Sequence, residues 1–151
     1  RAGTRNVQVH DHEKSLKDHL GRCDRVLVDA PCTGTGTWRR RPDTKWRLTQ
    51  KNLEERIGQQ REALGKASAY VRPGGHLCYV TCSLLPEENQ VQVRSFIDAN
   101  PEFELVSALD DWNTLFGHQP MRPYSSDGST LTLSPASTDT DGFFFAMLRR
   151  R

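Results

Sequence analysis

The chain has 151 residues, of which 21 are Lys or Arg and 19 are Asp or Glu, so its formal net charge at pH 7 is +2. This length suits one domain or a large part of one, and so small a net charge excludes an argument for nucleic-acid binding from the overall field of the protein. No stretch approaches the ~20 apolar residues of a membrane span and the N-terminus lacks the apolar segment of a signal peptide, so we expect a cytoplasmic protein without membrane contact.

The N-terminal part of the chain predicts three short elements. Residues 6–11, NVQVHD, alternate like a short strand, and the polar residues 13–20 favour a brief helix. Residues 25–29 then form an almost continuous aliphatic run. Such a run is typical of a strand that is covered on both faces, as in a parallel sheet.

The middle of the chain alternates helices with strands. Thr49 predicts the cap of an amphipathic helix that the RPGG segment at 72–75 stops. The apolar residues of this helix, at three- and four-residue multiples, are Leu53, Ile57, Leu64 and Val71. Residues 76–83 predict a second buried strand, and Pro86 begins a helix that ends at Asn100. This order is typical of a parallel α/β sheet.

The pattern changes after Glu102. A strand-like segment, FELVSAL, precedes a connection rich in Pro, Ser, Gly and Thr at 117–141, and the aromatic segment GFFFAMLRR predicts a last strand that closes the sheet. A cofactor-binding α/β fold carries a Gly-rich turn after its first strand, and none follows residues 6–11. We therefore expect the sequence to begin partway through a domain.

Reactive side chains follow both of the predicted buried strands. Asp29 and Cys32 come at the end of the first strand, and Cys82 comes at the end of the second. The carboxyl ends of neighbouring parallel strands share one edge of a sheet, so we expect two thiols and a carboxylate to converge there. A thiolate at such an edge can act as a nucleophile once its pKa is lowered. Simple packing of the thiols, and a turn cap at Asp29, are the alternatives for each residue taken singly.

The four cysteines do not indicate a metal site or a disulfide framework. They form no CxxC pair and have no histidines at zinc-finger spacing, and a reducing compartment disfavours disulfides. Two Cys and one Asp would also leave a zinc ion short of ligands. Cys23 and Cys78 are therefore assigned no role beyond packing.

A basic and aromatic segment follows the Cys32 loop directly. Residues 38–47, WRRRPDTKWR, hold five basic residues and two tryptophans. Basic charge with interleaved aromatic rings suits a phosphate backbone with stacked bases, so this segment predicts RNA binding. The predicted contacts are Arg39, Arg40, Arg41 and Lys45. The alternative is a solvated loop that its tryptophans anchor to the core, and the GTG sequence at 34–36 adds only a weak signal for an anion-binding turn.

Three segments, DAPCTGTGTWRRRPDTKW, PGGHLCYVTCSLLPEENQVQV and TDGFFFAML, closely resemble the catalytic half of the RNA cytosine-5 methyltransferases of the Sun (Nol/Nop/Sun) family. The likeness runs over nearly the whole chain, and two Cys motifs at this separation are highly specific. The resemblance implies a Rossmann-like α/β methyltransferase fold that uses S-adenosyl-L-methionine, in a bacterial enzyme for ribosomal RNA. Residues 1–151 would then be a partial domain, without the first strands and the Gly-rich cofactor loop, and inactive alone.

The resemblance also implies roles for individual residues. Cys82 would attack C6 of the target cytosine, and Cys32 would assist loss of the C5 proton and release of the enzyme. Asp29 would lie near both base and cofactor, with Pro31 and, by a looser match, Asp11 as further cofactor contacts. A target base has to be unstacked or single-stranded to enter such a site.

The chain departs from the family pattern, and other functions compete with this interpretation. Thr33 stands where the family usually has Ser, which keeps the hydroxyl. A DNA cytosine-5 methyltransferase would use Cys32 as the nucleophile, and the TCS and RRRPDTKW segments favour RNA over DNA. A transfer-RNA methyltransferase and a non-catalytic RNA-binding or assembly factor also remain as rival functions.

Overall fold

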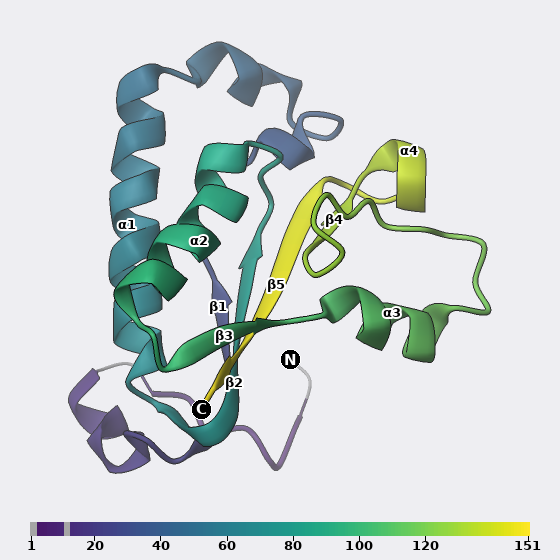
Figure 1. The fold of residues 1–151 in the computed structure, drawn as a ribbon. Coiled ribbons are helices and arrows are strands. Elements are labelled where there is room, and N and C mark those ends of the chain that lie inside the picture. Colours follow the sequence, from purple (N-terminus) through teal and green to yellow (C-terminus); the bar gives the residue numbers. More distant parts are fainter. Residues whose placement is uncertain (1–2, 11–12) are drawn as a thin grey trace.

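One mixed sheet organises the chain in a computed structural model that describes residues 3–10 and 13–151 (Figure 1). Its strands are β1 (Cys23–Asp29), β2 (Val71–Thr81), β3 (Phe103–Val106), β4 (Leu131–Leu133) and β5 (Phe143–Arg150). Their order is β1-β2-β5-β3, and β4 pairs with β5. β1 and β2 are parallel, whereas β5 runs antiparallel to β2, β3 and β4.

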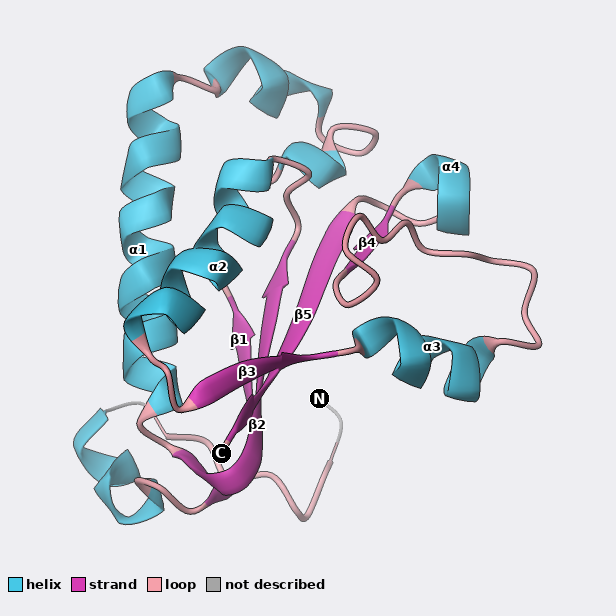
Figure 2. Cartoon of the chain, in the orientation of Figure 1, coloured by secondary structure: helices cyan, strands magenta, loops and turns pink. Residues whose placement is uncertain are grey.

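The predicted parallel sheet is therefore correct for β1 and β2 alone. The last strand was expected to close the sheet, but β5 lies inside it, between β2 and β3. A long connection from 117 to 142, which carries β4, brings the chain back to β5 without a crossover helix on the sheet (Figure 2). Parallel pairing needs such a crossover, so the returning strand enters in the opposite direction.

Helices cover one face of the sheet, where α1 and α2 pack side by side (Figure 1). The α-helices are α1 (Gln50–Ser68), α2 (Gln90–Ala99), α3 (Ala108–Phe116) and α4 (Pro135–Thr138). The 3-10 helices are η1 (Glu13–His19), η2 (Thr35–Thr37), η3 (Pro42–Arg47) and η4 (Pro86–Glu88). In the part of the chain that the structure describes, no helix combines the length and apolar character needed to cross a membrane.

The first long helix begins as its cap residue predicts and ends sooner. The Thr49 hydroxyl accepts a hydrogen bond from the Asn52 backbone N–H, at 3.2 Å. Val71 was expected on the helix but is the first residue of β2, fully buried and paired with Cys23. Between the pairs Cys23–Val71 and Arg25–His76, β1 advances two residues and β2 advances five. The RPGG segment thus lies in an irregular part of β2, where Gly74 has a φ of 75°.

The predicted strand at the N-terminus is wrong for residues 6–10, and its last residue lies outside the described part of the chain. Val7 and Val9 are 60% and 90% exposed. Alternating apolar residues make a strand only when a neighbouring strand accepts their backbone hydrogen bonds, and none pairs with this segment among the described residues. The helix expected at 13–20 is found as η1.

The core lies between the sheet and the helices α1 and α2. Its fully buried members include Leu64, Leu77, Tyr79, Phe144 and Leu148.

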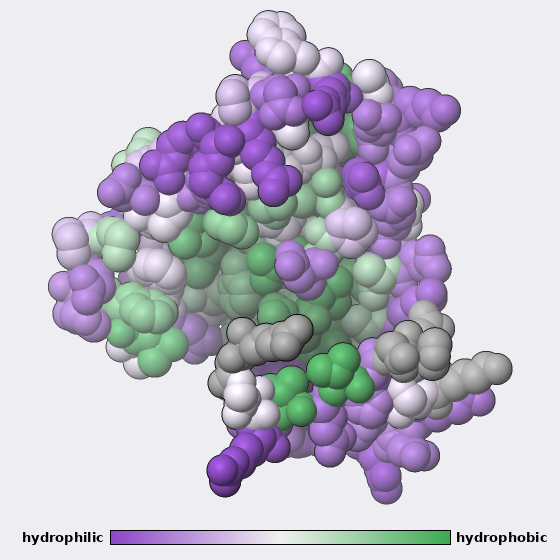
Figure 3. All heavy atoms as spheres, turned by 180° about the vertical axis from the view of Figure 1, so that it is seen from behind, coloured by the Kyte–Doolittle hydropathy of each residue, from purple (hydrophilic) through white to green (hydrophobic). Residues whose placement is uncertain are grey.

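The other face of the sheet carries a hollow of about 670 Å³, lined by apolar side chains of β2, β5 and α3 (Figure 3). Leu27 of β1 is 67% exposed, so the expectation that this strand is covered on both faces is wrong within the described residues. One helical layer, over one face, buries only the inward side chains of β1, such as Val28.

Candidate active site at the ends of β1 and β2

Two thiols meet where the parallel strands β1 and β2 end. Asp29 closes β1 opposite Val80 of β2, so the chain leaves both strands at the same level of the sheet. Cys32 and Cys82 follow, and their Sγ atoms lie 3.2 Å apart in a half-buried position. The predicted convergence of the two cysteine motifs is thus present in the fold.

The contact between the thiols separates their acidities. A hydrogen bond from Cys32 stabilises the Cys82 thiolate and lowers the pKa of Cys82 to about 7, although burial and the charges of Asp29 and Glu88 oppose this shift. The same hydrogen bond, together with burial, raises the pKa of Cys32 far above its ordinary value. Near neutral pH the pair therefore offers a thiolate at Cys82 beside a protonated Cys32.

The other residues predicted for the site lie around this pair. Asp29 is exposed at the end of β1, and its negative charge acts on Cys82. Pro31 is exposed, and its carbonyl accepts a hydrogen bond from Gln60 Nε2 of α1 at 3.0 Å. Asp11 lies outside the residues that the structure describes. The structure therefore brings together three of the predicted residues, Asp29, Cys32 and Cys82.

A buried glutamate that the sequence analysis missed connects the two thiol loops. Glu88 of η4 has no exposed surface. Its carboxylate accepts hydrogen bonds from residues next to both cysteines, Thr33 and Ser83, and from Gln60. The PEEN segment indicated only acidic residues in the first turn of a helix, which are favourable there without any further role.

Glycines let the Cys32 loop pack closely on its neighbours. The Gly36 N–H donates to the Cys82 carbonyl at 2.9 Å, and the Gly142 N–H donates to the Gly36 carbonyl at 2.8 Å. A Cβ atom on Gly36 would overlap the backbone of Gly142. This glycine therefore serves close backbone packing, a role that the GTG sequence alone did not indicate.

The basic segment after this loop divides into two parts. Arg39 Nη2 lies 3.4 Å from Asp141 Oδ1, and Arg40 forms an ion pair with the same, nearly buried carboxylate. Lys45 Nζ lies 5.7 Å from the ring centres of Trp38 and of Trp46. Arg39 and Arg40, two of the predicted RNA contacts, thus connect this segment to Asp141, which lies just before β5.

Arg41 and Lys45 keep exposed positions on the same segment. Arg41 is exposed at the start of η3, and Trp46 beside Lys45 is 83% exposed. An exposed aromatic ring next to cations suits base stacking more than core anchoring. The alternative of a loop held by both tryptophans therefore does not fit Trp46.

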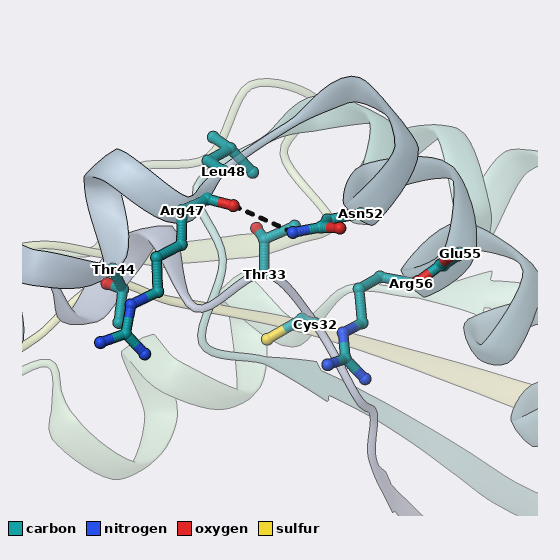
Figure 4. A pocket seen from close by; sticks show the side chains of 8 residues that line it. All are labelled: Cys32, Thr33, Thr44, Arg47, Leu48, Asn52, Glu55 and Arg56. Atoms are coloured by element: carbon teal, nitrogen blue, oxygen red, sulfur yellow. Dashed lines mark hydrogen bonds between the residues drawn. The ribbon is translucent and has the colours of Figure 1, made fainter.

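A polar pocket of about 260 Å³ opens beside Cys32. Its lining residues are Cys32, Thr33, Thr44, Arg47, Leu48, Asn52, Glu55 and Arg56. The guanidinium groups of Arg47 and Arg56 point to either side of the thiol (Figure 4). The volume lies below the ~300–1,000 Å³ of sites for whole drug-sized ligands, so the pocket suits one part of a nucleotide. Arg56 was missed because it is isolated from the basic segment in the sequence.

Comparison with known proteins gives consistent relatives. The family model described as 16S rRNA methyltransferase RsmB/F matches residues 1–149. The ribosomal RNA small subunit methyltransferase B of Cronobacter sakazakii is 37% identical over 132 residues, which cover 85% of this chain and 26% of that protein.

Solved structures agree with this family. The crystal structure of PH0851 aligns with a TM-score of 0.75 and 37% identity over 87% of this chain and 27% of that one. The crystal structure of NSun6 from Pyrococcus horikoshii with SFG aligns with a TM-score of 0.65 and 31% identity over 82% of this chain and 29% of that one. The chain thus spans between a quarter and a third of the length of these relatives.

Proposed function

Because the chain belongs to the 16S rRNA methyltransferase RsmB/F family, we propose that the full-length protein transfers a methyl group to C5 of a cytosine in small-subunit ribosomal RNA. The observation that supports this proposal most is the contact of two thiols, 3.2 Å apart, at the ends of neighbouring parallel strands. A cytoplasmic location, where thiols stay reduced, goes with it.

Cys82 is the nucleophile in this proposal. Cytosine C5 is too weak a nucleophile to be methylated directly. The Cys82 thiolate therefore forms a bond to C6, and the electron pair of the C5–C6 double bond becomes available at C5. With a pKa of about 7, Cys82 is substantially ionised near neutral pH without any external base.

Cys32 serves the second half of the reaction. Its pKa is raised by the hydrogen bond of Cys82, by burial and by the charge of Cys82. The hydrogen bond and the charge no longer act when the Cys82 sulfur bonds to C6, because that sulfur then carries no negative charge. The pKa of Cys32 falls at this point, so its thiol can lose its proton to solvent. The Cys32 thiolate then takes the C5 proton, the C5–C6 double bond forms again, and Cys82 leaves C6 as a thiolate.

The methyl donor in the proposal is S-adenosyl-L-methionine, which supplies an electrophilic methyl group when bound. The residues of this chain fit one part of its site. Asp29 and Pro31 lie exposed at the carboxyl end of β1, where ligands of α/β sheets bind. The Asp29 carboxylate suits the positively charged part of this cofactor. SFG, present with the Pyrococcus NSun6, is an analogue of the same cofactor, and Asp11 stays a predicted contact.

RNA is held in this proposal by the exposed groups around the Cys32 pocket. Arg41, Lys45 and Trp46 offer charge and a stacking surface on η3, while Arg47 and Arg56 flank the thiol (Figure 4). Guanidinium groups form bidentate contacts with phosphates. The small polar pocket between them suits a single nucleotide unit that has left its stack.

A covalent trapping assay tests the function. The full-length protein is incubated with S-adenosyl-L-methionine and small-subunit ribosomal RNA that carries 5-fluorocytosine, whose C5 fluorine prevents the release step. We expect a covalent protein–RNA band for the wild-type protein and for Cys23→Ala, a thiol control remote from the site, and no band for Cys82→Ala.

Two other outcomes would contradict the proposal. A band lost only with Cys32→Ala would make Cys32 the nucleophile, as in DNA cytosine-5 methyltransferases. RNA binding without a band in any variant would indicate a non-catalytic RNA-binding factor.

A further inference from the structure

The carboxylate of Glu88 is fully buried and accepts four hydrogen bonds. Its Oε1 atom accepts from the Thr33 backbone N–H at 2.8 Å and from Gln60 Nε2 at 2.9 Å. Its Oε2 atom accepts from the hydroxyls of Thr33 and Ser83, each at 2.5 Å. A buried carboxylate is costly unless its oxygens are hydrogen-bonded, and here each oxygen has two donors.

These donors adjoin the two thiols. Thr33 follows Cys32 in the chain, and Ser83 follows Cys82. We propose that Glu88 is a positioning residue that holds the Cys32 loop against the Cys82 loop and so keeps the two sulfur atoms in contact. This inference rests on the proposed function for its catalytic meaning, whereas the contact between the thiols can be tested without RNA or cofactor.

The surroundings of Glu88 fix its own place. The Tyr79 hydroxyl donates to the Glu88 backbone carbonyl at 2.7 Å, from inside β2. Gln60 of α1 donates both to Glu88 and to the Pro31 carbonyl, just before Cys32. The carboxylate is thus anchored to the sheet and to α1, and it transmits that fixed position to both loops. Displacement of a reacting group by about 1 Å can reduce catalysis by about a hundredfold.

The contact of Thr33 with Glu88 explains why Thr can stand where the family usually has Ser. The hydroxyl that Thr shares with Ser is the group that donates to Glu88 Oε2. The second donor to the same oxygen is the Ser83 hydroxyl, which also accepts from the Leu85 N–H at 3.1 Å. The hydroxyl at position 33 therefore supplies one of the hydrogen bonds that link the loops.

Positioning and simple electrostatics predict opposite effects on Cys82. The negative charge of Glu88 raises the pKa of Cys82, whereas the hydrogen bond from Cys32 lowers it. Removal of the charge alone would therefore lower the pKa. Removal of the link between the loops would separate the thiols and raise it. Cys32 and Asp29, the other titratable groups that act on this thiol, are not substituted in either case.

Gln is the matched substitution at position 88. Its carbonyl oxygen can accept from the Thr33 N–H and from Gln60, which only donate. Its NH₂ group can donate to the hydroxyls of Thr33 and Ser83, because hydroxyls also accept. Gln thus keeps the four contacts without the charge, whereas Ala removes all four. Glu87→Ala is the control, since Glu87 is exposed in the same turn.

The test is the pH profile of Cys82 alkylation by iodoacetamide in the full-length protein, followed by mass spectrometry of the peptide that carries Cys82. We expect a midpoint near 7 for the wild-type protein and for Glu87→Ala, and at or below that pH for Glu88→Gln. For Glu88→Ala we expect the midpoint to move towards the ordinary value of 9.0, with alkylation at pH 7 slowed about tenfold or more.

An unchanged or lowered midpoint in folded Glu88→Ala would overturn the proposal, and so would a Glu88→Gln profile that matches Glu88→Ala. Thermal unfolding identifies the folded variants. If Glu88→Ala does not fold, Thr33→Val tests the same link, because it removes one donor to Oε2 and keeps the backbone N–H. The midpoint of Cys82 alkylation should also rise in this variant. An unchanged midpoint would overturn the proposal. A failure of the trapping assay in the wild-type protein would contradict the proposed function and leave these thiol profiles to decide the role of Glu88.

Discussion

Cys32 and Cys82 are fifty positions apart in the chain, yet their sulfur atoms lie 3.2 Å from each other. Parallel pairing of β1 with β2 accounts for this contact, because both strands end at one edge of the sheet. The contact makes the two thiols chemically unequal. Cys82 becomes the more acidic group, and Cys32 becomes the less acidic one.

The first prediction concerns the acidity of Cys82. In Cys32→Ala the thiolate loses its hydrogen-bond donor, while burial and the charges of Asp29 and Glu88 still disfavour it. The pKa of Cys82 should rise from about 7 to 9.0 or above. A thiol is alkylated as its thiolate, so the rate at pH 7 should fall by about 50-fold or more and recover as the pH is raised. Rates measured from pH 5 to pH 10 would check this.

Cys78→Ala is the matched control for that measurement. Cys78 lies within β2, four residues before Cys82, and it lines the apolar hollow. Its removal should leave the midpoint for Cys82 near 7. Equal profiles for Cys32→Ala and the wild-type protein would show that the acidity of Cys82 has another origin.

Close packing of two glycines supports a second prediction. Gly36→Ala would push a methyl group into the backbone of Gly142, where no flexible side chain can give way. We expect the free energy of unfolding to fall by about 1–3 kcal/mol, the usual cost of overpacking. Gly58→Ala, with open space around its Cβ position on α1, should be neutral or slightly stabilising. Urea unfolding of both variants measures the difference, and equal stabilities would contradict the packing argument.

The ion pairs of Asp141 give a third prediction. Asp141→Asn removes the charge that holds Arg39 and Arg40, so residues 38–47 should become more accessible to trypsin, with cleavage several-fold faster. Asp43→Asn is the control and should leave the cleavage rate unchanged. The ion pair of Asp43 with Arg47 is exposed and lies within η3, and such pairs contribute little to stability. Cleavage of Asp141→Asn at the wild-type rate would mean that other contacts hold the segment.

Local patterns predicted much of the site because two cysteine motifs in the sequence indicate it. Each cysteine motif directly follows an aliphatic run, and one helix between the runs suffices for parallel pairing. The same reasoning failed for β5. Its aromatic residues indicate a strand, but its place between β2 and β3 depends on how the 117–142 connection returns, which no local pattern encodes.

Glu88 illustrates the limit more sharply. Glu87 and Glu88 are neighbours in one acidic turn, and either suits the start of a helix. Only the pairing of η4 with the Cys32 loop buries one of them and leaves the other exposed. That selection is made by contacts between segments 55 residues apart, so the identity of the linking carboxylate becomes visible only in the folded chain.

The last prediction concerns the two arginines that flank Cys32. If Arg47 and Arg56 contact phosphates of the bound RNA, replacing either with Ala should weaken binding and make it less sensitive to salt. For single-stranded RNA, each lost phosphate contact reduces the slope of log affinity against log salt by about 0.7. The slope should therefore fall by about 0.7 for each single variant and by about 1.4 for the double variant. Arg61 is exposed on α1, the helix that also carries Arg56, but it lies outside the pocket, so Arg61→Ala should keep the wild-type slope. Fluorescence anisotropy at several salt concentrations measures these slopes. If all the variants share one slope, the pocket beside Cys32 does not hold the RNA backbone, and the exposed groups Arg41 and Lys45 would have to supply the phosphate contacts.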